Sequence, residues 1–580
     1  MVRLRVGFLV IAIAMSVFGA RLVQLQAIDP GAYAEMAFAE GVQEVVLPAE
    51  RGAIRDRNGY ELATSMDGLM VVADPKLTRE YAGQLATFLA ERLDVDYFET
   101  LTRLRKEGEG GRFQYIARRV PATKARRAVD EADERGWKGL STERDPIRAY
   151  PADDVAANII GFIGQDDESG PLAGLERTFD EQLAGVDGMA RYQTGGGAKI
   201  PLGENTVVPP EDGEDLTLTI DSDTQYFVQR VLGKAVRQAR ADSGSAVVMD
   251  SRTGDLLAWG DYPTFDANDP TASPEDDLGS RGVQHVYEPG SVEKALTMAG
   301  LVDQGMSPHT RIEVPPTLPL EGATIHDHFD HGDLKLTLTG VLAKSSNIGT
   351  VLSSQKISSG ALHSYLRGFG LGQRTNVGAR GESAGLLPDP SGWSSLQHGT
   401  IAFGQGLGVT AVQMAAAINT IANGGTYISP SLIKGRATSN AGLEVGTDLK
   451  KTRRVVSEGA AHEVSMMMEK VLDPEDGVGA MAKVPGYRVA GKTGTAQVAE
   501  GGRYVDGKFD VSFAGFAPAD DPRFTIYIVI HNPRNGLGGG GNAGPAFARI
   551  MSYLLRHYSV PPTGTPPSDY RVEWGPEADE

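Results

Sequence analysis

The 580-residue sequence contains no cysteine. This absence excludes thiol catalysis, cysteine-ligated zinc sites and disulfide bonds together. An exported protein of this composition has to be stabilised by its core alone, since no covalent cross-link is available. The lack of cysteine does not establish export, but it is compatible with it.

The sequence also lacks an excess of positive charge. Its formal net charge is -19, whereas sequence-independent binding of nucleic acid requires a basic surface. We therefore expect no nucleic-acid partner, and the acidic balance favours solubility or a cationic or neutral partner. Hydrophobic residues make up 41% and charged residues 23% of the chain, as is ordinary for a folded protein. The length predicts about three or four domain-sized units.

Long apolar runs are missing everywhere except at the N-terminus. The uncharged residues 6–20 follow two arginines, which predicts a cytoplasmic tail over 1–5 and a single transmembrane anchor over 6–26. The rest of the chain would then lie on the extracytoplasmic side of the cytoplasmic membrane. A cleaved signal peptide and a buried core helix are the alternatives. The bulky Phe18 lies where a cleavage site requires a small side chain, so a retained anchor is favoured.

Residues 40–210 have the pattern of a separate module with mixed α and β structure. Asn58-Gly59 is a turn signal between two strand-like runs. Helical periodicity follows over Tyr81–Arg92 and Ala122–Arg135. The glycine-rich stretch Thr194–Ala198 is typical of a linker and predicts the end of the module.

Residues 211–560 predict a second, larger domain built on an antiparallel sheet. Ser245–Asp250 and Asp255–Tyr262 alternate as one hairpin, and Val511–Phe516 and Phe524–Ile530 as another. Helical segments beside and between these strands indicate an α+β fold with helices packed on the sheet and a helical subdomain. The predicted helices are Asp223–Arg240, Ala411–Ala422, Ala460–Val471 and Pro545–His557. Residues 561–580 are rich in proline and acidic residues, which predicts a disordered tail.

Ser291-Val-Glu-Lys294 is a candidate nucleophile with its base. Helix-breaking residues precede it and an apolar-periodic run follows, so Ser291 is predicted near a helix N-terminus. Lys294 would lie one turn further on the same face, within hydrogen-bond reach. Lysine can deprotonate a serine only if burial or a nearby positive charge lowers its pKa toward neutrality. This spacing is common by chance, so the string alone is a weak signal.

Ser345-Ser-Asn347 suits a tight turn with two side chains directed into a cleft. Ser345 could relay a proton to a leaving nitrogen, and Asn347 could hold a substrate amide through its donor and its acceptor. Taken alone, the string is better explained as an ordinary loop. Its value comes from its place between the other two strings.

Lys492-Thr-Gly-Thr495 predicts a strand beside the cleft. Lys492 would supply the second positive charge, and the hydroxyls of Thr493 and Thr495 would bind a carboxylate. Gly494 would allow a substrate backbone to approach closely. The backbone N–H groups of Ser291 and Thr495 would form an oxyanion hole. A surface edge strand with a protective lysine is the alternative.

Two other clusters are tempting but weaker. His326, His328 and His331 have a spacing that can ligate a metal. A solvated loop is the simpler interpretation of this turn-rich segment, so we predict no metal site. The glycines 538–541 lack a following Gly-Lys-Ser/Thr and predict a mobile loop near the cleft instead of a phosphate loop. Tyr287, before the nucleophile, is expected to be structural.

The three strings in this order resemble those of penicillin-binding proteins and serine β-lactamases. Over nearly its whole length the chain resembles a class B penicillin-binding protein, a membrane-anchored peptidoglycan D,D-transpeptidase. Lys344–Gly349 is more similar to the division-specific (septal) subgroup than to the elongation-specific one. Ser346 replaces the Asp of the Ser-Asp-Asn form, a variation that the family tolerates. Further similar strings are Arg51–Ala63, Gly174-Leu-Glu176, Phe179-Asp180, Leu183, Gly185, Phe403–Gly406 and Thr410–Met414.

The resemblance implies a penicillin-binding, serine β-lactamase-like transpeptidase domain over 211–560 on an elongated α+β pedestal over 40–210. Ser291 would attack the D-alanyl-D-alanine end of a stem peptide, release D-alanine and pass the acyl group to an amine of a neighbouring stem peptide. β-Lactams would acylate the same serine, and no cofactor is needed. One implied partner is a SEDS-family glycosyltransferase, which would supply the glycan-polymerising activity that this chain lacks. Other membrane divisome proteins are further implied partners. The implied catalytic residues are Ser291, Lys294, Ser345, Asn347 and Lys492.

Other classes of function stay open. A D,D-carboxypeptidase or β-lactamase would carry the same trio, but the N-terminal module and the anchor oppose it. No convincing Glu-x-x-Leu-Asn string of a class A β-lactamase is present. A β-lactam sensor or divisome scaffold without turnover would not need to retain Ser291, Lys294 and Lys492 together. An elongation-specific transpeptidase would differ from a septal one in its location.

Overall fold

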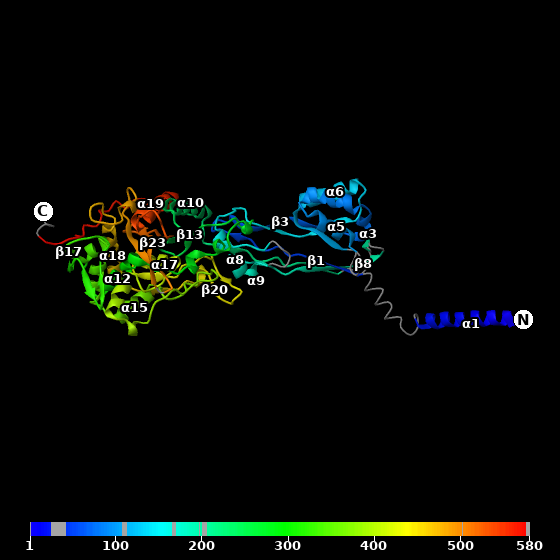
Figure 1. Ribbon diagram of the computed structural model, residues 1–580, viewed down its shortest axis with the longest axis horizontal. Coiled ribbons are helices and arrows are strands. Elements are labelled where there is room, and N and C mark those ends of the chain that lie inside the picture. The colour runs from blue at the N-terminus through cyan, green and yellow to red at the C-terminus, as the bar shows by residue number, and fades with distance from the viewer. Residues whose placement is uncertain are drawn as a thin grey trace. The chain divides into compact units, whose positions relative to one another are not determined.

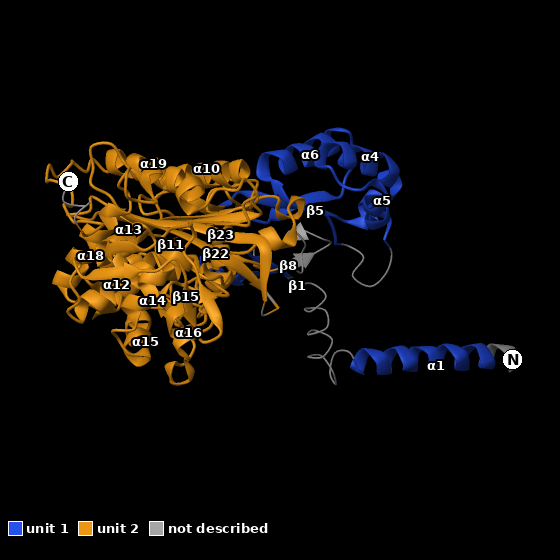
Figure 2. Cartoon of the chain, turned by 60° about the vertical axis from the view of Figure 1, so that its left-hand side comes forward, with its two compact units in different colours: residues 1–51, 65–147, 184–214 blue, residues 52–64, 148–183, 215–580 orange. Residues whose placement is uncertain are grey.

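The structure is a computed structural model that describes residues 2–24, 42–106, 113–164, 170–195, 198–199, 206–501 and 503–575 (Figure 1). It divides into two compact units (Figure 2). Unit 1 comprises residues 1–51, 65–147 and 184–214, and unit 2 comprises residues 52–64, 148–183 and 215–580. The segment 40–210, predicted as one module, is therefore interrupted twice, because residues 52–64 and 148–183 pack within unit 2.

The N-terminal helix α1 spans Val2–Val23. Among the described residues, its segment Arg5–Val23 is the one helix that is long and apolar enough to cross a membrane. The predicted anchor over 6–26 is thus helical in its described part. Residues 25 and 26 lie outside the described residues.

Unit 1 contains a small antiparallel sheet with helices packed on it, and a second antiparallel sheet. The helices predicted at Tyr81–Arg92 and Ala122–Arg135 are confirmed to within one residue. The first sheet and its helices are β4 (Gly68–Ala73), β5 (Gln114–Pro121), β6 (Leu140–Arg144), α4 (Ala82–Leu93), α5 (Tyr97–Arg105) and α6 (Ala122–Glu134).

The second sheet of unit 1 overturns the linker predicted at Thr194–Ala198. Strand β8 (Gly188–Gly195) pairs with β1 (Val42–Leu47), β10 (Thr206–Val208) and β9 (Ala198–Lys199). Thr194 and Gly195 therefore pair with Lys199 and Ala198 in a short antiparallel hairpin. Residues 196 and 197 lie outside the described residues.

Unit 2 is organised around a five-stranded antiparallel sheet in the order β13-β12-β24-β23-β22. Both predicted hairpins are confirmed, since β12 pairs with β13 and β23 pairs with β24. Every residue of β24 is buried, because helices cover both faces of the sheet. The strands are β12 (Ser243–Asp250), β13 (Leu256–Tyr262), β22 (Ala490–Glu500), β23 (Arg503–Ala517) and β24 (Phe524–His531).

Helices cover the sheet on two sides, as the α+β prediction requires. Figure 2 shows α10 and α19 on one side and α12, α14 and α18 on the other. All residues of α17 are buried, because it packs against β12, β24 and α18 at once. The four predicted helices are present as α10 (Ser222–Ala239), α17 (Ala411–Ala422), α18 (Glu458–Lys470) and α19 (Gly539–His557).

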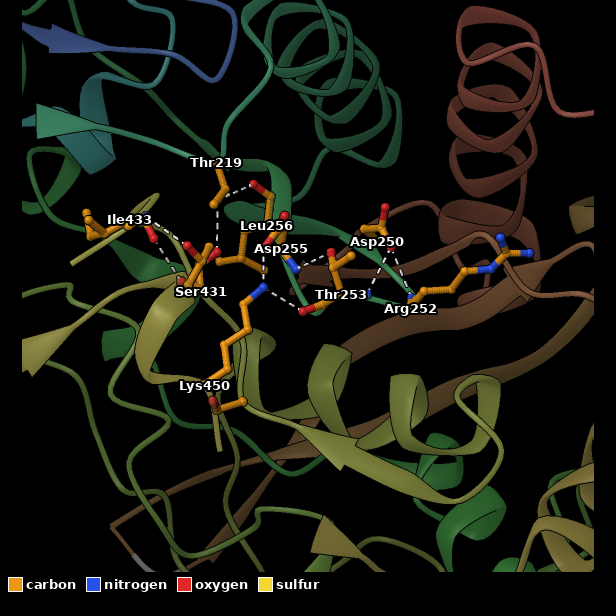
Figure 3. Close-up of polar contacts among 12 residues, drawn as sticks. Thr219, Asp250, Arg252, Thr253, Asp255, Leu256, Ser431, Ile433 and Lys450 are labelled. Atoms are coloured by element: carbon orange, nitrogen blue, oxygen red, sulfur yellow. Dashed lines mark hydrogen bonds and ion pairs between the residues drawn. The ribbon is translucent and has the colours of Figure 1, made fainter. Parts of the chain in front are cut away.

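The turn between β12 and β13 is held by a polar network (Figure 3). Lys450 Nζ donates to the carbonyl oxygen of Thr253 at 2.6 Å and pairs with the carboxylate of Asp255. Thr219 Oγ1 donates to the carbonyl oxygen of Ser431 at 2.8 Å. Since β13 and β22 lie at opposite edges of the sheet, this network stiffens the edge remote from Lys492 and has a structural role.

The C-terminal segment 561–575 contradicts the predicted disordered tail. Val572 is 4% exposed, and the backbone N–H of Ser568 donates to Glu469 Oε2 at 3.2 Å. Leu336 and Glu573 form an antiparallel bridge. Composition failed here because backbone hydrogen bonds and a few apolar anchors order a chain that is polar on average. Residues 576–580 lie outside the described residues.

Candidate active site

Ser291 lies in a 3₁₀ turn, Gly290–Val292, directly before helix α12 (Lys294–Asp303), which confirms its predicted place near a helix N-terminus. Gly290 has a φ of 57°, and a Cβ at this position would lie 2.7 Å from the carbonyl oxygen of Thr495. A Cβ on Gly404 would lie 2.0 Å from the carbonyl oxygen of Gly290. Glycine is therefore required at both positions for the nucleophile turn to pack between its neighbours.

A cleft of about 830 Å³ opens beside this turn. Its lining includes five of the predicted site residues: Ser291, Ser345, Asn347, Thr493 and Thr495. Lys294 and Lys492 lie behind them with no exposed surface. The structure thus brings together in one place three strings that are separated by up to two hundred residues in the sequence.

Lys294 is buried, and its hydrogen bonds go to the Ser345 turn instead of to Ser291. Its Nζ lies 2.6 Å from the carbonyl oxygen of Ser345 and 2.8 Å from Asn347 Oδ1. A neutral amine has two N–H donors, which these two acceptors would occupy, so its lone pair stays available as a base. The direct contact expected between Lys294 and Ser291 is absent among the described residues, as is common before substrate binds.

The Ser345–Asn347 turn joins two helices, α13 (Leu338–Ala343) and α14 (Asn347–Ser354). Ser345 has a φ of 58°, an uncommon conformation for a residue other than glycine. Ser346 caps α14 by accepting the backbone N–H of Gly349 at 2.8 Å. Serine and aspartate are both favoured at this helix position, which explains why Ser346 can stand where the Ser-Asp-Asn form has aspartate.

Asp327 is a site residue that the sequence did not identify. Its carboxylate accepts from Ser346 Oγ at 2.6 Å and from the backbone N–H of Ile348 at 3.0 Å, and it lies 3.2 Å from His331 Nε2. Asn347 Nδ2 donates to the carbonyl oxygen of His326 at 3.0 Å. The segment that carries Asp327 therefore holds the turn from Ser346 to the start of α14.

The solvated loop predicted for the histidine cluster is confirmed for His326 and His328, which are exposed, but it is wrong for His331. The side chains of Asp327 and His331 are 0% and 4% exposed, respectively, because they pack beneath the turn. Within the part of the chain that the structure describes, no group of three or more His, Cys, Asp or Glu side chains is arranged to hold a metal ion. The only sequence signal for Asp327 was its place in this polar cluster.

Lys492 lies on a strand, β22, as predicted, and its Nζ donates to Ser345 Oγ at 2.8 Å. Thr493 and Thr495 alternate onto the opposite side of the strand and line the cleft. Gly494 permits a close approach, as predicted, but the prediction that substrate atoms approach there is wrong. A Cβ at Gly494 would meet Ser512 Oγ at 2.1 Å and the carbonyl oxygen of Pro289 at 3.1 Å, so it makes room for protein atoms instead of substrate.

The glycines 538–541 lie beside the cleft, but most of them are helical, not a loop. Gly538 is the N-cap of α19, and Gly539 begins the helix. A Cβ at Gly539 would lie 2.4 Å from the carbonyl oxygen of Gly494, so the absent side chain lets the helix start against β22. A Cβ at Gly538 would lie 3.2 Å from Thr495 Oγ1. The positive end of the α19 dipole therefore lies beside the hydroxyls of β22.

The two lysines have different electrostatic surroundings. Burial lowers the pKa of Lys294 to about 7, while the carboxylates of Asp327 and Glu293 oppose this shift. Burial also raises the pKa of Glu293 well above its ordinary value. Burial and repulsion from Lys294 lower the pKa of Lys492 well below its ordinary value.

Tyr287, expected to be structural, is buried behind the nucleophile turn. Its hydroxyl donates to the hydroxyl of Tyr527 at 2.9 Å, and burial raises its pKa well above the ordinary value. Its backbone forms an antiparallel bridge with Val409. These contacts anchor the segment that leads into Ser291 from the side of the sheet.

The fold and the site together define the class of protein. In this class, helices flank an antiparallel sheet, and a serine that lines the cleft lies beside two buried lysines. Comparison with known proteins identifies the family. Residues 244–552 match the penicillin-binding protein transpeptidase domain, and residues 46–218 match the penicillin-binding protein dimerisation domain. The chain belongs to the penicillin-binding proteins that combine these two domains.

Curated relatives cover nearly the whole chain. It is 36% identical to penicillin-binding protein PbpB of Mycolicibacterium smegmatis, over 96% of this chain and 91% of the relative. It is 32% identical to the peptidoglycan D,D-transpeptidase FtsI of Escherichia coli, over 95% of this chain and 91% of the relative.

Solved structures show the same fold. The penicillin-binding protein 3 of Mycobacterium tuberculosis, in complex with aztreonam, superposes with a TM-score of 0.69 at 31% identity and covers 92% of this chain and 100% of that structure. A peptidoglycan synthetase of Bifidobacterium adolescentis superposes with a TM-score of 0.72 at 29% identity, with the same coverage.

Proposed function

We propose that this protein is a peptidoglycan D,D-transpeptidase that works through an acyl-enzyme on Ser291. The observation that carries the proposal is the hydrogen-bonded path Lys294–Ser345–Lys492, buried beside a serine that lines an open cleft. A lysine whose pKa is about 7 can accept a proton at physiological pH. The names of its relatives, which include a peptidoglycan D,D-transpeptidase, support the same reaction.

In the acylation step, the Lys294 amine accepts the proton of the Ser291 hydroxyl as Oγ attacks the carbonyl carbon of a D-alanyl-D-alanine end. The backbone N–H groups of Ser291 and Thr495 stabilise the oxyanion. The peptide C–N bond then breaks and D-alanine leaves. Ser345 Oγ, which accepts from Lys492 at 2.8 Å and lies 3.4 Å from Lys294 Nζ, is placed to pass its proton to the leaving nitrogen and to recover one from the Lys294 ammonium, which returns Lys294 to the neutral amine.

In the second step, an amine of a neighbouring stem peptide attacks the ester carbonyl of the acyl-enzyme. Lys294 accepts the proton of the amine and gives it to Ser291 Oγ as this atom leaves, so that the serine hydroxyl and the neutral Lys294 amine are both restored. The new amide bond is the cross-link. Attack by water instead of the amine would give the D,D-carboxypeptidase or β-lactamase reaction, so the acceptor decides between these outcomes.

Substrate orientation would come from both sides of the cleft. The hydroxyls of Thr493 and Thr495 and the N-terminus of α19 favour the terminal carboxylate of the donor peptide. Asn347, which also lines the cleft, would bind the peptide amide. β-Lactams carry the same carboxylate and an acylating carbonyl, so they would enter the same positions and acylate Ser291.

We further propose a role in septal cell-wall synthesis at the cytoplasmic membrane. The apolar helix Arg5–Val23 would anchor the chain, with the catalytic unit on the extracytoplasmic side. The names of the relatives and the string Lys344–Gly349 support a division role over an elongation role. A SEDS-family glycosyltransferase and other divisome proteins are the proposed partners.

A fluorescent penicillin tests the proposed chemistry. The wild type and the exposed-serine control Ser364→Ala should be labelled covalently, whereas Ser291→Ala should not. An unlabelled wild type would exclude the enzyme class, and rapid loss of the label would favour a β-lactamase.

Exchange of the terminal D-alanine of a synthetic stem peptide for an added D-amino acid, followed by mass spectrometry, separates a transpeptidase from a sensor or scaffold. Mid-cell fluorescence of a fusion would support the septal role, and lateral-wall fluorescence the elongation role.

A further inference from the structure

The C-terminal segment 568–575 lies along strand β17 (Leu334–Thr337), the strand that leads into α13. Figure 1 shows the red C-terminal segment ending beside β17. The backbone N–H of Thr337 donates to the carbonyl oxygen of Val572 at 2.9 Å, and that of Trp574 donates to the carbonyl oxygen of Lys335 at 3.0 Å. The segment thus adds an extended edge to β17.

The same segment fixes the N-terminus of α13. Thr337 is the N-cap of this helix, and its Oγ1 accepts the backbone N–H of Gly340 at 3.0 Å while donating to the carbonyl oxygen of Arg571 at 2.6 Å. A Cβ at Gly340 would lie 1.9 Å from the carbonyl oxygen of Val572. A glycine in the first turn of α13 therefore permits the segment to seat against the helix.

The segment also reaches the C-terminus of α13. Lys344 follows this helix, and its Nζ lies 3.1 Å from Glu573 Oε1. The next residue is Ser345, whose carbonyl oxygen accepts from Lys294 and whose hydroxyl accepts from Lys492. A helix of six residues is therefore held at both ends by one segment, immediately before the turn that touches both active-site lysines.

Independent contacts anchor the segment to the rest of unit 2. The Trp574 ring lies beneath the cations of Arg311 and Lys335, at 5.1 and 5.5 Å from the ring centroid. Tyr570 donates its hydroxyl to Glu463 Oε2 at 2.7 Å. The segment lies outside residues 244–552, which match the transpeptidase domain of the family.

We propose that residues 568–575 act as a positioning segment for the Ser345–Asn347 turn and thereby set the rate of Ser291 acylation. The segment holds α13 in the position that keeps Ser345 between Lys294 and Lys492. Within the described chain, none of its residues lines the cleft and none of its backbone hydrogen bonds reaches the nucleophile turn, so it acts through α13 and not on the substrate. This inference rests on the proposed acylation of Ser291.

The test compares a chain ending at Pro567 with a control chain ending at Gly575. Penicillin acylation is followed over a range of drug concentrations, which separates the limiting rate of acylation from the apparent dissociation constant. The shorter chain should lose about tenfold in the limiting rate, with the dissociation constant unchanged within about twofold. A synthetic peptide of residues 561–575, added in trans, should restore the rate with saturation.

Gly340→Ala in the full chain gives a second test that does not depend on the folding of the truncated protein. It should lower the limiting rate, because the new Cβ displaces Val572. In the shorter chain the same substitution should have no further effect. Equal rates in the two chains, or a peptide that binds without restoring the rate, would overturn the proposal. Failure of the proposed function would instead appear as a full-length chain that is not acylated at all, which would overturn both.

Discussion

The helical side and the sheet side of the cleft each contribute one fully buried lysine, and the two lysines are not equivalent. On the helical side, Lys294 lies near the Asp327 carboxylate and has a pKa of about 7. On the sheet side, burial and the repulsion of Lys294 lower the pKa of Lys492 well below the ordinary value. The difference assigns the proton-accepting role to Lys294. Lys492 would regain a proton most readily when an anionic substrate enters the cleft.

Removing each lysine should sharpen this division of roles. Lys294→Met should lower the second-order rate of penicillin acylation by about a thousandfold, since it removes the base. Lys492→Met should cost about a hundredfold, because it removes the hydrogen-bond donor to Ser345 but leaves the base. Stopped-flow acylation measures both values. A larger loss in Lys492→Met than in Lys294→Met would reverse the assignment.

The same Lys492→Met variant should be more stable than the wild type at pH 7 by a margin that shrinks at pH 9. Burial and the repulsion of Lys294 lower the pKa of Lys492 well below its unfolded value, so the unfolded chain binds the proton more tightly and wild-type stability rises with pH between the two pKa values. The gain is about 1.4 kcal/mol per pH unit for one such group. Denaturant unfolding at both pH values measures the difference. A margin that stays constant would mean that Lys492 is charged in the folded protein.

Asp327→Asn should move the acid limb of the pH–rate profile of acylation toward lower pH by about one unit. The reason is that the substitution removes the carboxylate that favours the charged form of Lys294. The other groups near Lys294 are Glu293, Lys492 and His328, which the substitution leaves in place. Asp330→Asn, an exposed residue of the same segment, serves as the control and should leave the limb unchanged. A limb that moves upward in Asp327→Asn would show that Asp327 does not act through Lys294.

The smallest expected effect concerns the helix cap. Ser346→Ala should lower the free energy of unfolding by about 1 kcal/mol, since α14 loses its N-cap. Ser346→Asp should cost more, although aspartate is also a good cap, because Ser346 Oγ lies 2.6 Å from the carboxylate of Asp327. Thermal unfolding of the two variants ranks them. A more stable Ser346→Asp would mean that Asp327 is protonated or turned away.

The sequence predicted the local parts of the site and missed the parts that depend on distant contacts. Ser291 and Lys294 are one helical turn apart, so their spacing is visible in the sequence. Asp327 meets Ser346 only through the folded chain, and no local pattern marks it. Gly494 was recognised as a close-approach position, but the sequence could not reveal that the approaching atoms belong to Ser512 and Pro289.

The fold shows the same division. Periodicity predicted both hairpins of the sheet and located α17 to the residue, because a buried helix and paired strands have regular patterns. It failed at Thr194 and Gly195, which pair with β9 in a short hairpin, and over 561–575, where Val572 and Trp574 pair with the remote strand β17. Average composition describes such a segment as a whole, so it cannot show that a single residue such as Val572 is buried.

The pH dependence of the limiting acylation rate, measured between pH 5 and 9 with penicillin in excess, tests the role of Lys294 most directly. The wild-type rate should rise about tenfold per pH unit on the acid side and level off above a pKa of about 7. In Lys294→Met the residual rate should show no such limb. An unchanged limb in Lys294→Met would assign the titrating base to another group and contradict the role of Lys294.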